Sequence, residues 1–197
     1  MDLEKDIQHL NSIIISHGHE DHFGKADYFQ KKYGTNIYMS KFDYELAKNA
    51  FPKINREPIN FHINHFLSDG EILDFGDVQI KAISTPGHTP GCFSFLIPVT
   101  DEGRLHTAAL WGGAGLMQNS NVSDYLISWK KFSNICNKNK VDAEISTHPF
   151  LDMGKNRLEI VRNITDGVPN PFVIGEDGYR YYEKMFYNYA LNKLSHK

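Results

Sequence analysis

The chain has 197 residues, a formal net charge of −3, 41% hydrophobic residues and 13% aromatic residues. This length and composition predict one folded domain, residues 1–197, and argue against an intrinsically disordered protein. The sequence contains no apolar run near the roughly 18 residues of a membrane span, and no long basic run. We therefore expect neither a membrane nor a nucleic acid as a partner.

The cysteines and the first ten residues bear on the cellular compartment. Cys92 and Cys136 stand in no metal-binding spacing, so we expect two reduced thiols. The segment from Met1 to Leu10 is charged and lacks the apolar region of a signal peptide. As written, the chain is therefore expected in the cytoplasm. A natural chain that begins further upstream would instead suit the periplasm or secretion.

The pattern of apolar residues predicts a mixed α/β domain. A β-branched run at 12–16, a helical spacing over 23–33 and a second strand at 36–39 form a β-α-β unit with parallel strands. A second helix is expected from Phe42 to Ala50, followed by an irregular stretch that reaches His65. Later strands, antiparallel at first, are expected at 71–75, 78–84, 92–99, 106–111 and 143–146.

Three more helices are expected in the second half of the chain. They cover 123–137, 154–164 and 176–195, and Ser123 is the candidate N-cap of the first. The apolar stripe that we expect to pack the last helix against the sheet consists of Tyr181, Met185, Phe186 and Tyr189.

The segment from Ser16 to His22 carries the chemistry. It reads Ser-His-Gly-His-Glu-Asp-His and lies where the first strand ends, the position at which α/β sheets place ligands. His17 and His19 can project to one side, while Asp21 and His22 can aim at a neighbouring point, which suits two metal ions. The alternative is a polar loop that caps a helix. Capping needs one or two groups, however, and three crowded imidazoles would repel one another when protonated without a cation.

Two more histidines follow predicted strand ends. His88 lies in a loop with two prolines and two glycines, and His148 precedes Pro149. A lone loop histidine is ordinarily a solvated turn residue. Because a zinc ion needs about three or four protein ligands, we interpret both as further metal ligands.

Three segments together resemble the metal-binding signature of the metallo-β-lactamase superfamily. They are the histidine motif at 17–22, the Thr-Pro-Gly-His-Thr-Pro-Gly loop at 85–91, and Ser-Thr-His-Pro at 146–149. The tail from Asn170 also resembles the histidine-rich third subclass of metallo-β-lactamases. The resemblance implies an αββα sandwich with two zinc ions at one sheet edge and a hydroxide between them as nucleophile, which Asp21 orients. It assigns His17, His19 and His88 to one zinc, and Asp21, His22 and His148 to the other.

The sequence departs from the family pattern at two places. Many members carry a metal-bridging aspartate near residues 110–115, where this chain reads Leu-Trp-Gly-Gly-Ala-Gly. Cys92 lies too close to His88 to replace it and is expected to be a small buried side chain. Members also carry strands before the histidine motif, so we expect an N-terminally incomplete sandwich. This would be either a truncated product or a homo-oligomer whose second copy covers the sheet edge.

The resemblance implies a dinuclear zinc hydrolase that attacks a carbonyl group of a small-molecule substrate. A cyclic amide of the β-lactam type is favoured over a thioester or lactone of the glyoxalase II type, because the bridging aspartate is absent. Two alternatives stay open, a nuclease with the same metal pair and a metal-binding relative without activity. The other histidines are expected in surface or supporting roles: His9, His62, His65, His106 and His196.

Overall fold

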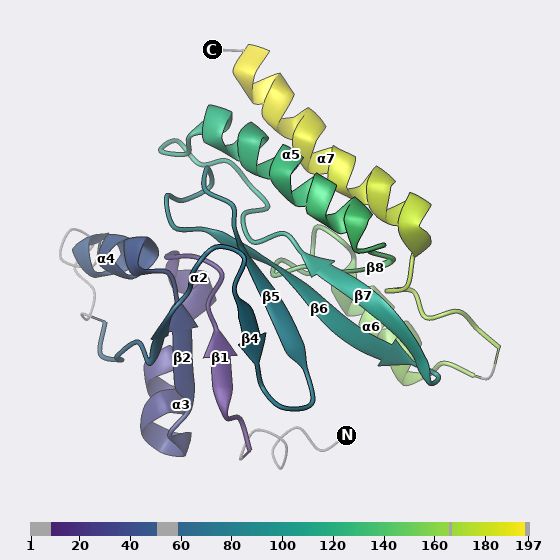
Figure 1. Ribbon diagram of the computed structural model, residues 1–197, viewed down its shortest axis with the longest axis horizontal. Coiled ribbons are helices and arrows are strands. Elements are labelled where there is room, and N and C mark those ends of the chain that lie inside the picture. Colours follow the sequence, from purple (N-terminus) through teal and green to yellow (C-terminus); the bar gives the residue numbers. More distant parts are fainter. Residues whose placement is uncertain (1–8, 51–58, 166, 196–197) are drawn as a thin grey trace.

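The computed structural model describes residues 9–50, 59–165 and 167–195 (Figure 1). A three-stranded parallel sheet in the order β1-β2-β3 comes first, with β1 Ser12–Ile14, β2 Asn36–Met39 and β3 His65–Phe66. The crossover from β1 to β2 contains α2 (Glu20–Phe23) and α3 (Ala26–Tyr33). Helix α3 ends at Gly34, whose φ of +67° is the left-handed conformation that glycine adopts without strain. The predicted β-α-β unit and its parallel pairing are confirmed.

The second sheet has five strands in the order β4-β5-β6-β7-β8. The strands are β4 Ile72–Asp74, β5 Gln79–Ser84, β6 Phe93–Asp101, β7 Arg104–Leu110 and β8 Ala143–Ile145. Pairing is antiparallel from β4 to β7 and parallel between β7 and β8. Strands β5, β7 and β8 therefore run in the same direction, and their carboxyl ends meet at one edge of the sheet.

Helices cover the outer faces of both sheets (Figure 1). Helices α5 (Val122–Lys138) and α7 (Gly175–Ser195) lie side by side over the larger sheet. The two remaining helices are α4 (Lys41–Ala50), which follows β2, and α6 (Gly154–Arg162), which follows β8. The core beneath α5 and α7 includes Trp111, Tyr125, Phe132, Tyr179 and Phe186. A second cluster packs α3 and α4 on the small sheet.

A third cluster fills the space between the two sheets, with Leu67, Leu73, Phe93 and Phe95 buried there. The layers are thus helix, sheet, sheet and helix, which confirms the predicted αββα sandwich. Within the described residues, no helix is both long and apolar enough to cross a bilayer.

The predicted N-cap of α5 was wrong, and strand β3 was not predicted. The N-cap of α5 is Asn121, whose side chain accepts a hydrogen bond from the amide of Asp124, and Ser123 lies inside the helix. Strand β3 lies within the stretch that we expected to be irregular, because a two-residue strand leaves no alternation to detect.

The packed face of α7 also differs from the predicted stripe. Its buried residues are Tyr179, Glu183, Phe186 and Ala190. Tyr181 is instead 76% exposed, and Met185 and Tyr189 are also exposed. Aromatic residues occur all around this helix, so its neighbour α5, and not the periodicity alone, selects the face that is buried.

Candidate metal centre

Three separate turns bring the predicted ligands together. His17 and His19 lie in the turn after β1, and Asp21 and His22 lie in α2. His88 lies in the loop after β5, and the sixth residue, His148, follows β8. The six side chains form two groups whose ligand atoms each lie within 4.8 Å of one another: His17, His19 and His88, and Asp21, His22 and His148. This is the division that the family resemblance implied.

In the first group, one ring nitrogen each of His17, His19 and His88 lies close to the other two residues' rings. The Nε2 atom of His88 lies 3.1 Å from Nε2 of His17 and 3.0 Å from Nδ1 of His19. Nδ1 of His88 lies 2.5 Å from the carbonyl oxygen of Gly115. A carbonyl oxygen only accepts, so Nδ1 carries the proton and the lone pair of Nε2 faces the other two rings.

The spacing of these nitrogens fits a zinc ion. Two nitrogens bound to one tetrahedral zinc at about 2.0–2.1 Å lie about 3.3 Å apart. A backbone carbonyl on the opposite ring nitrogen is also the usual support of a metal-binding histidine. The residues of the first group therefore fit zinc by spacing, by donor type and by tautomer.

Burial keeps the imidazoles of His17 and His88 neutral. Desolvation lowers the pKa of His17 far below its usual value, and the neighbouring histidines lower it further. Desolvation also lowers the pKa of His88 to about 4, although its hydrogen bond to Gly115 acts in the opposite direction. Both rings are thus unprotonated at neutral pH, the form that binds a metal ion.

The second group lies directly beside the first. Nε2 of His22 lies 3.2 Å from Nε2 of His148 and 3.4 Å from Oδ2 of Asp21. The ring centroids of His17 and His22 are 3.9 Å apart, so the two groups are adjacent. Desolvation lowers the pKa of His22 to about 4, against the opposing charge of Asp21. The Asp21 side chain is 64% exposed, so this group opens to solvent.

The loop after β7 contributes backbone and no ligand side chain. A side chain at Gly113 would overlap Cβ of His88, and one at Gly112 would overlap the carbonyl of Phe93. Gly112 and Gly113 therefore let this loop pack closely against Phe93 and His88. Cys92 is fully buried and forms no disulfide, and burial raises the pKa of its thiol. Its expected role as a small buried side chain is confirmed.

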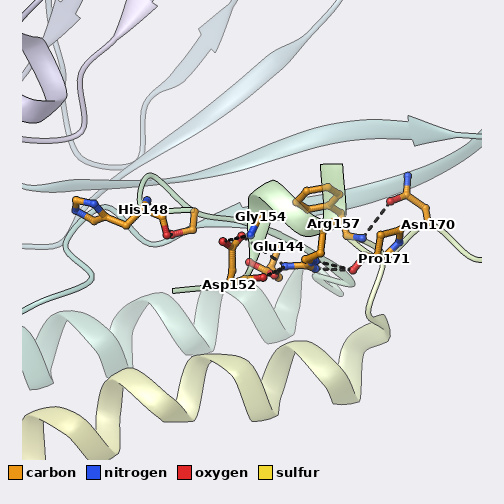
Figure 2. Close-up of polar contacts among 9 residues, drawn as sticks. Glu144, His148, Asp152, Gly154, Arg157, Asn170 and Pro171 are labelled. Carbon is orange, nitrogen blue, oxygen red and sulfur yellow. Dashed lines mark hydrogen bonds and ion pairs between the residues drawn. The ribbon is translucent and has the colours of Figure 1, made fainter. Parts of the chain in front are cut away.

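The loop that carries His148 rests on a buried polar cluster (Figure 2). The amide of Leu151 donates to the carbonyl of His148 at 2.9 Å, and the amide of Gly154 donates to Oδ1 of Asp152 at 2.9 Å. Arg157 of α6 reaches both Glu144 of β8 and Asp152. Figure 2 shows the imidazole of His148 pointing away from this cluster, and its Nε2 atom lies 3.2 Å from Nε2 of His22.

Asp43 is a residue of the site that sequence analysis missed. Its carboxylate is fully buried and accepts hydrogen bonds from Gly18, Thr89 and Gly91, in the two turns that carry the first ligand group. A single aspartate in the first turn of a helix resembles an ordinary N-terminal charge, so the sequence carried no signal for this role.

The remaining described histidines lie outside both groups. His9 is exposed, and His62 contacts Asn64 at the surface. His65 and His106 each contact a carboxylate at 2.6 Å, Glu71 and Asp142 respectively. Their expected surface or supporting roles fit these positions, and His196 lies outside the described residues.

Comparison with known proteins identifies the family. The family model of the metallo-beta-lactamase superfamily matches residues 1–101. The hydroxyacylglutathione hydrolase GloC of Haemophilus influenzae is 31% identical over 96 residues, which cover 44% of this chain and 44% of that protein. A hydroxyacylglutathione hydrolase of Francisella philomiragia is 25% identical over 180 residues, 89% of this chain and 60% of that protein. The alignments with the first curated relatives span 33% to 44% of the length of those proteins.

Solved structures support the same fold. The FEZ-1 metallo-beta-lactamase of Legionella gormanii superimposes with a TM-score of 0.81 at 21% identity, over 95% of this chain and 75% of that chain. At this identity the likeness concerns the fold, and the family model carries the assignment. With half of its residues matched by that model, the chain belongs to the metallo-beta-lactamase superfamily.

Proposed function

We propose that this chain is a zinc-dependent hydrolase that cleaves a carbonyl-centred bond in a small molecule, with two zinc ions at the site. The observation that carries the proposal is the presence of two adjacent groups of three ligand side chains. Members of the superfamily are hydrolases, and among the similar proteins is a polyketide biosynthesis hydrolase of Bacillus velezensis that is named as zinc-dependent.

His17, His19 and His88 would hold one zinc ion, and Asp21, His22 and His148 the other. Zinc supplies Lewis acidity, since it lowers the pKa of water toward about 7 and polarises a carbonyl group. The chain itself contributes imidazole ligands in two adjacent groups and a hydrogen bond from His88 to Gly115 that holds the His88 ring in place.

Asp21 has a second task in this proposal. Its carboxylate is 64% exposed and lies 3.4 Å from Nε2 of His22, so it lies between a ligand ring and solvent. A carboxylate in this position can orient a water molecule, accept its proton and pass it to a leaving group. None of the six ligands is a serine or cysteine, so the proposal needs no covalent intermediate on the protein.

An apolar side chain flanks the site and favours a small molecule as substrate. Phe150 is 76% exposed, and its ring centroid lies 5.3 Å from that of His148. This ring offers apolar surface beside the polar ligands, the usual composition of a small-molecule site.

Among possible substrates, a cyclic amide of the β-lactam type is our first candidate. The loop after β7 has no carboxylate, so the second group relies on Asp21, His22 and His148. This donor set is the one that the resemblance to the third subclass implies, and two of the similar solved structures are named subclass B3 metallo-beta-lactamases.

A glutathione thioester is the second candidate. Its support comes from the curated relatives, among which hydroxyacylglutathione hydrolases are prominent at 25% to 32% identity. Zinc-loaded protein should be assayed against a β-lactam panel, S-lactoylglutathione and acyl lactones, with metal content measured in the same samples. Two bound zinc ions without turnover of any of these compounds would contradict the proposed hydrolase and favour a metal-binding relative without activity.

A further inference from the structure

We propose that Asp43 is a positioning residue that holds the two turns of the first ligand group at the separation needed for zinc binding. The inference rests on the proposed function, because it assumes that His17, His19 and His88 bind zinc. It concerns a residue of α4 that touches none of the six ligand side chains through its hydrogen bonds.

The carboxylate of Asp43 accepts from both turns at once. Its Oδ2 atom lies 2.8 Å from the amide nitrogen of Gly18 and 2.5 Å from Oγ1 of Thr89. Its Oδ1 atom lies 2.7 Å from the amide nitrogen of Gly91. The amide of Asp43 in turn donates to Oγ of Ser40 at 3.1 Å, which fixes the first turn of the helix.

Two of these donors are immediate neighbours of the ligands, and the third, Gly91, lies in the same loop as His88. Gly18 separates His17 from His19, and Thr89 directly follows His88. A single buried carboxylate thus connects the backbone of the first turn to the loop that carries the third ligand. Because the two turns lie 71 residues apart in the sequence, no local bond can set their separation.

Backbone and side-chain atoms pack closely around Asp43. A side chain at Gly18 would come within 2.5 Å of the carbonyl oxygen of Asp43. A side chain at Gly91 would overlap Oγ of Ser40 and come within 2.7 Å of Oδ1 of Asp43. Both glycines therefore permit a close approach of backbone to the carboxylate, which explains why this residue type occurs at each position.

Burial makes these hydrogen bonds strong determinants of geometry. Asp43 is 0% exposed, and a buried carboxylate without its donors would be costly. The protein satisfies it with three donors, and moving either turn would break at least one of these bonds. Residues Asp21, His22 and His148 take no part in this arrangement, so the effect should be confined to the first group.

The test replaces one oxygen with an amide group. In Asp43→Asn, either orientation of the side chain turns an NH2 group toward a backbone N–H donor, Gly18 or Gly91. Zinc affinity is measured by competition with a chromophoric chelator in two backgrounds, His148→Ala, which keeps the first group, and His88→Ala, which keeps the second. Substitution of residues that support metal ligands weakens metal binding by about 10- to 100-fold. We expect a loss of this size in the first background and a change below about threefold in the second.

A readout without metal accompanies this test. In the metal-free protein, the amides of Gly18 and Gly91 should exchange with solvent at least about tenfold faster in Asp43→Asn than in the wild type. Asp74→Asn is the matched control, because Asp74 also accepts a glycine amide, that of Gly76 at 2.8 Å, in the turn between β4 and β5. It should change neither zinc affinity nor the exchange of these two amides.

Thr89→Val provides a milder variant that removes one of the three donors. In the His148→Ala background it should weaken zinc binding when Asp43 is present and have no further effect when Asp43 is already replaced by Asn. Equal weakening of both groups, or unchanged affinity of the first group in both variants, would overturn the inference. Absence of turnover by zinc-loaded wild-type protein would instead contradict the proposed hydrolase, and the affinity comparison would still stand.

Discussion

Arg157 and Glu144 form a buried ion pair that joins helix α6 to strand β8 beneath the His148 loop (Figure 2). The Arg157 side chain is 12% exposed and that of Glu144 is 2% exposed. The same guanidinium lies 3.5 Å from Oδ2 of Asp152 and donates from Nε to the carbonyl of Pro171 at 3.0 Å. One cation therefore connects the strand, the loop that follows His148 and the segment before α7.

Removing this cation should destabilise the fold. In Arg157→Met, Glu144 keeps a buried charge without a partner, a change that typically lowers the free energy of unfolding by about 3–5 kcal/mol. Urea denaturation measures the difference. Arg162→Met, on the same helix, is the control, because Arg162 is 53% exposed and its pair with Glu159 lies at the surface. It should change stability by less than about 1 kcal/mol. Equal effects of both substitutions would refute the assigned role of Arg157.

Asp21 should be essential for turnover. We expect Asp21→Asn to abolish measurable hydrolysis, because the amide can neither accept a proton nor bind metal as a carboxylate does. The loss of general acid–base catalysis alone should reduce kcat by about 100- to 10,000-fold. His62→Ala should leave rate and zinc content nearly unchanged, since His62 lies outside both groups. Steady-state kinetics and metal analysis of both variants check this prediction. An equal loss of rate in both would show that the ligand assignment is wrong.

Gly87 should be intolerant of any side chain. Its φ is +134°, and a Cβ atom there would overlap the backbone nitrogen of Tyr125. Gly87→Ala should therefore lower the free energy of unfolding by more than the roughly 1–3 kcal/mol of a strained backbone alone. Gly103→Ala separates the two effects, because Gly103 has a φ of +77° and open space around it. Urea denaturation should show the larger loss for Gly87, and the opposite order would contradict the packing argument.

Stability should respond to pH through Glu183. Burial raises the pKa of this carboxyl, while Ser133, Lys184 and Arg180 act in the opposite direction. Because the pKa is higher in the folded state, its stabilising contribution is complete below the unfolded pKa of about 4.3. That contribution is lost as the pH rises through the folded pKa.

Glu183→Gln removes this titration. The difference in Tm between variant and wild type should therefore shift in favour of the variant as the pH rises from about 4 to about 7. Thermal unfolding followed by circular dichroism at a series of pH values measures it. The control, Glu159→Gln, changes a carboxyl that is 64% exposed on α6 and should show a constant difference. A constant difference for Glu183→Gln as well would contradict the effect of burial.

The sequence predicted the ligand residues because their signal is local. His17, His19, Asp21 and His22 occur within six positions at the end of a strand, a density that few other roles produce. His88 and His148 were predicted from the same strand-end position. The β-α-β unit and the later antiparallel strands were likewise predictable, because hydrophobic periodicity and glycine turns are properties of short segments.

Residue contacts across the chain could not be predicted in this way. Asp43 and Gly18 are 25 residues apart, and Arg157 and Glu144 are 13 apart, so neither contact leaves a local pattern in the sequence. The buried face of α7 was also missed, because its aromatic residues occupy several faces and only the neighbouring α5 selects among them.

The sequence by itself determined the superfamily, the sandwich and the six candidate ligands, since these depend on residue types and on spacing along the chain. Only the tertiary structure decided how closely the two ligand groups lie, which carbonyl orients His88 and which buried charges support the loops. The physical reason is that a buried polar group must find its partner among residues brought together by folding. Such partners leave no mark on the local pattern of the sequence.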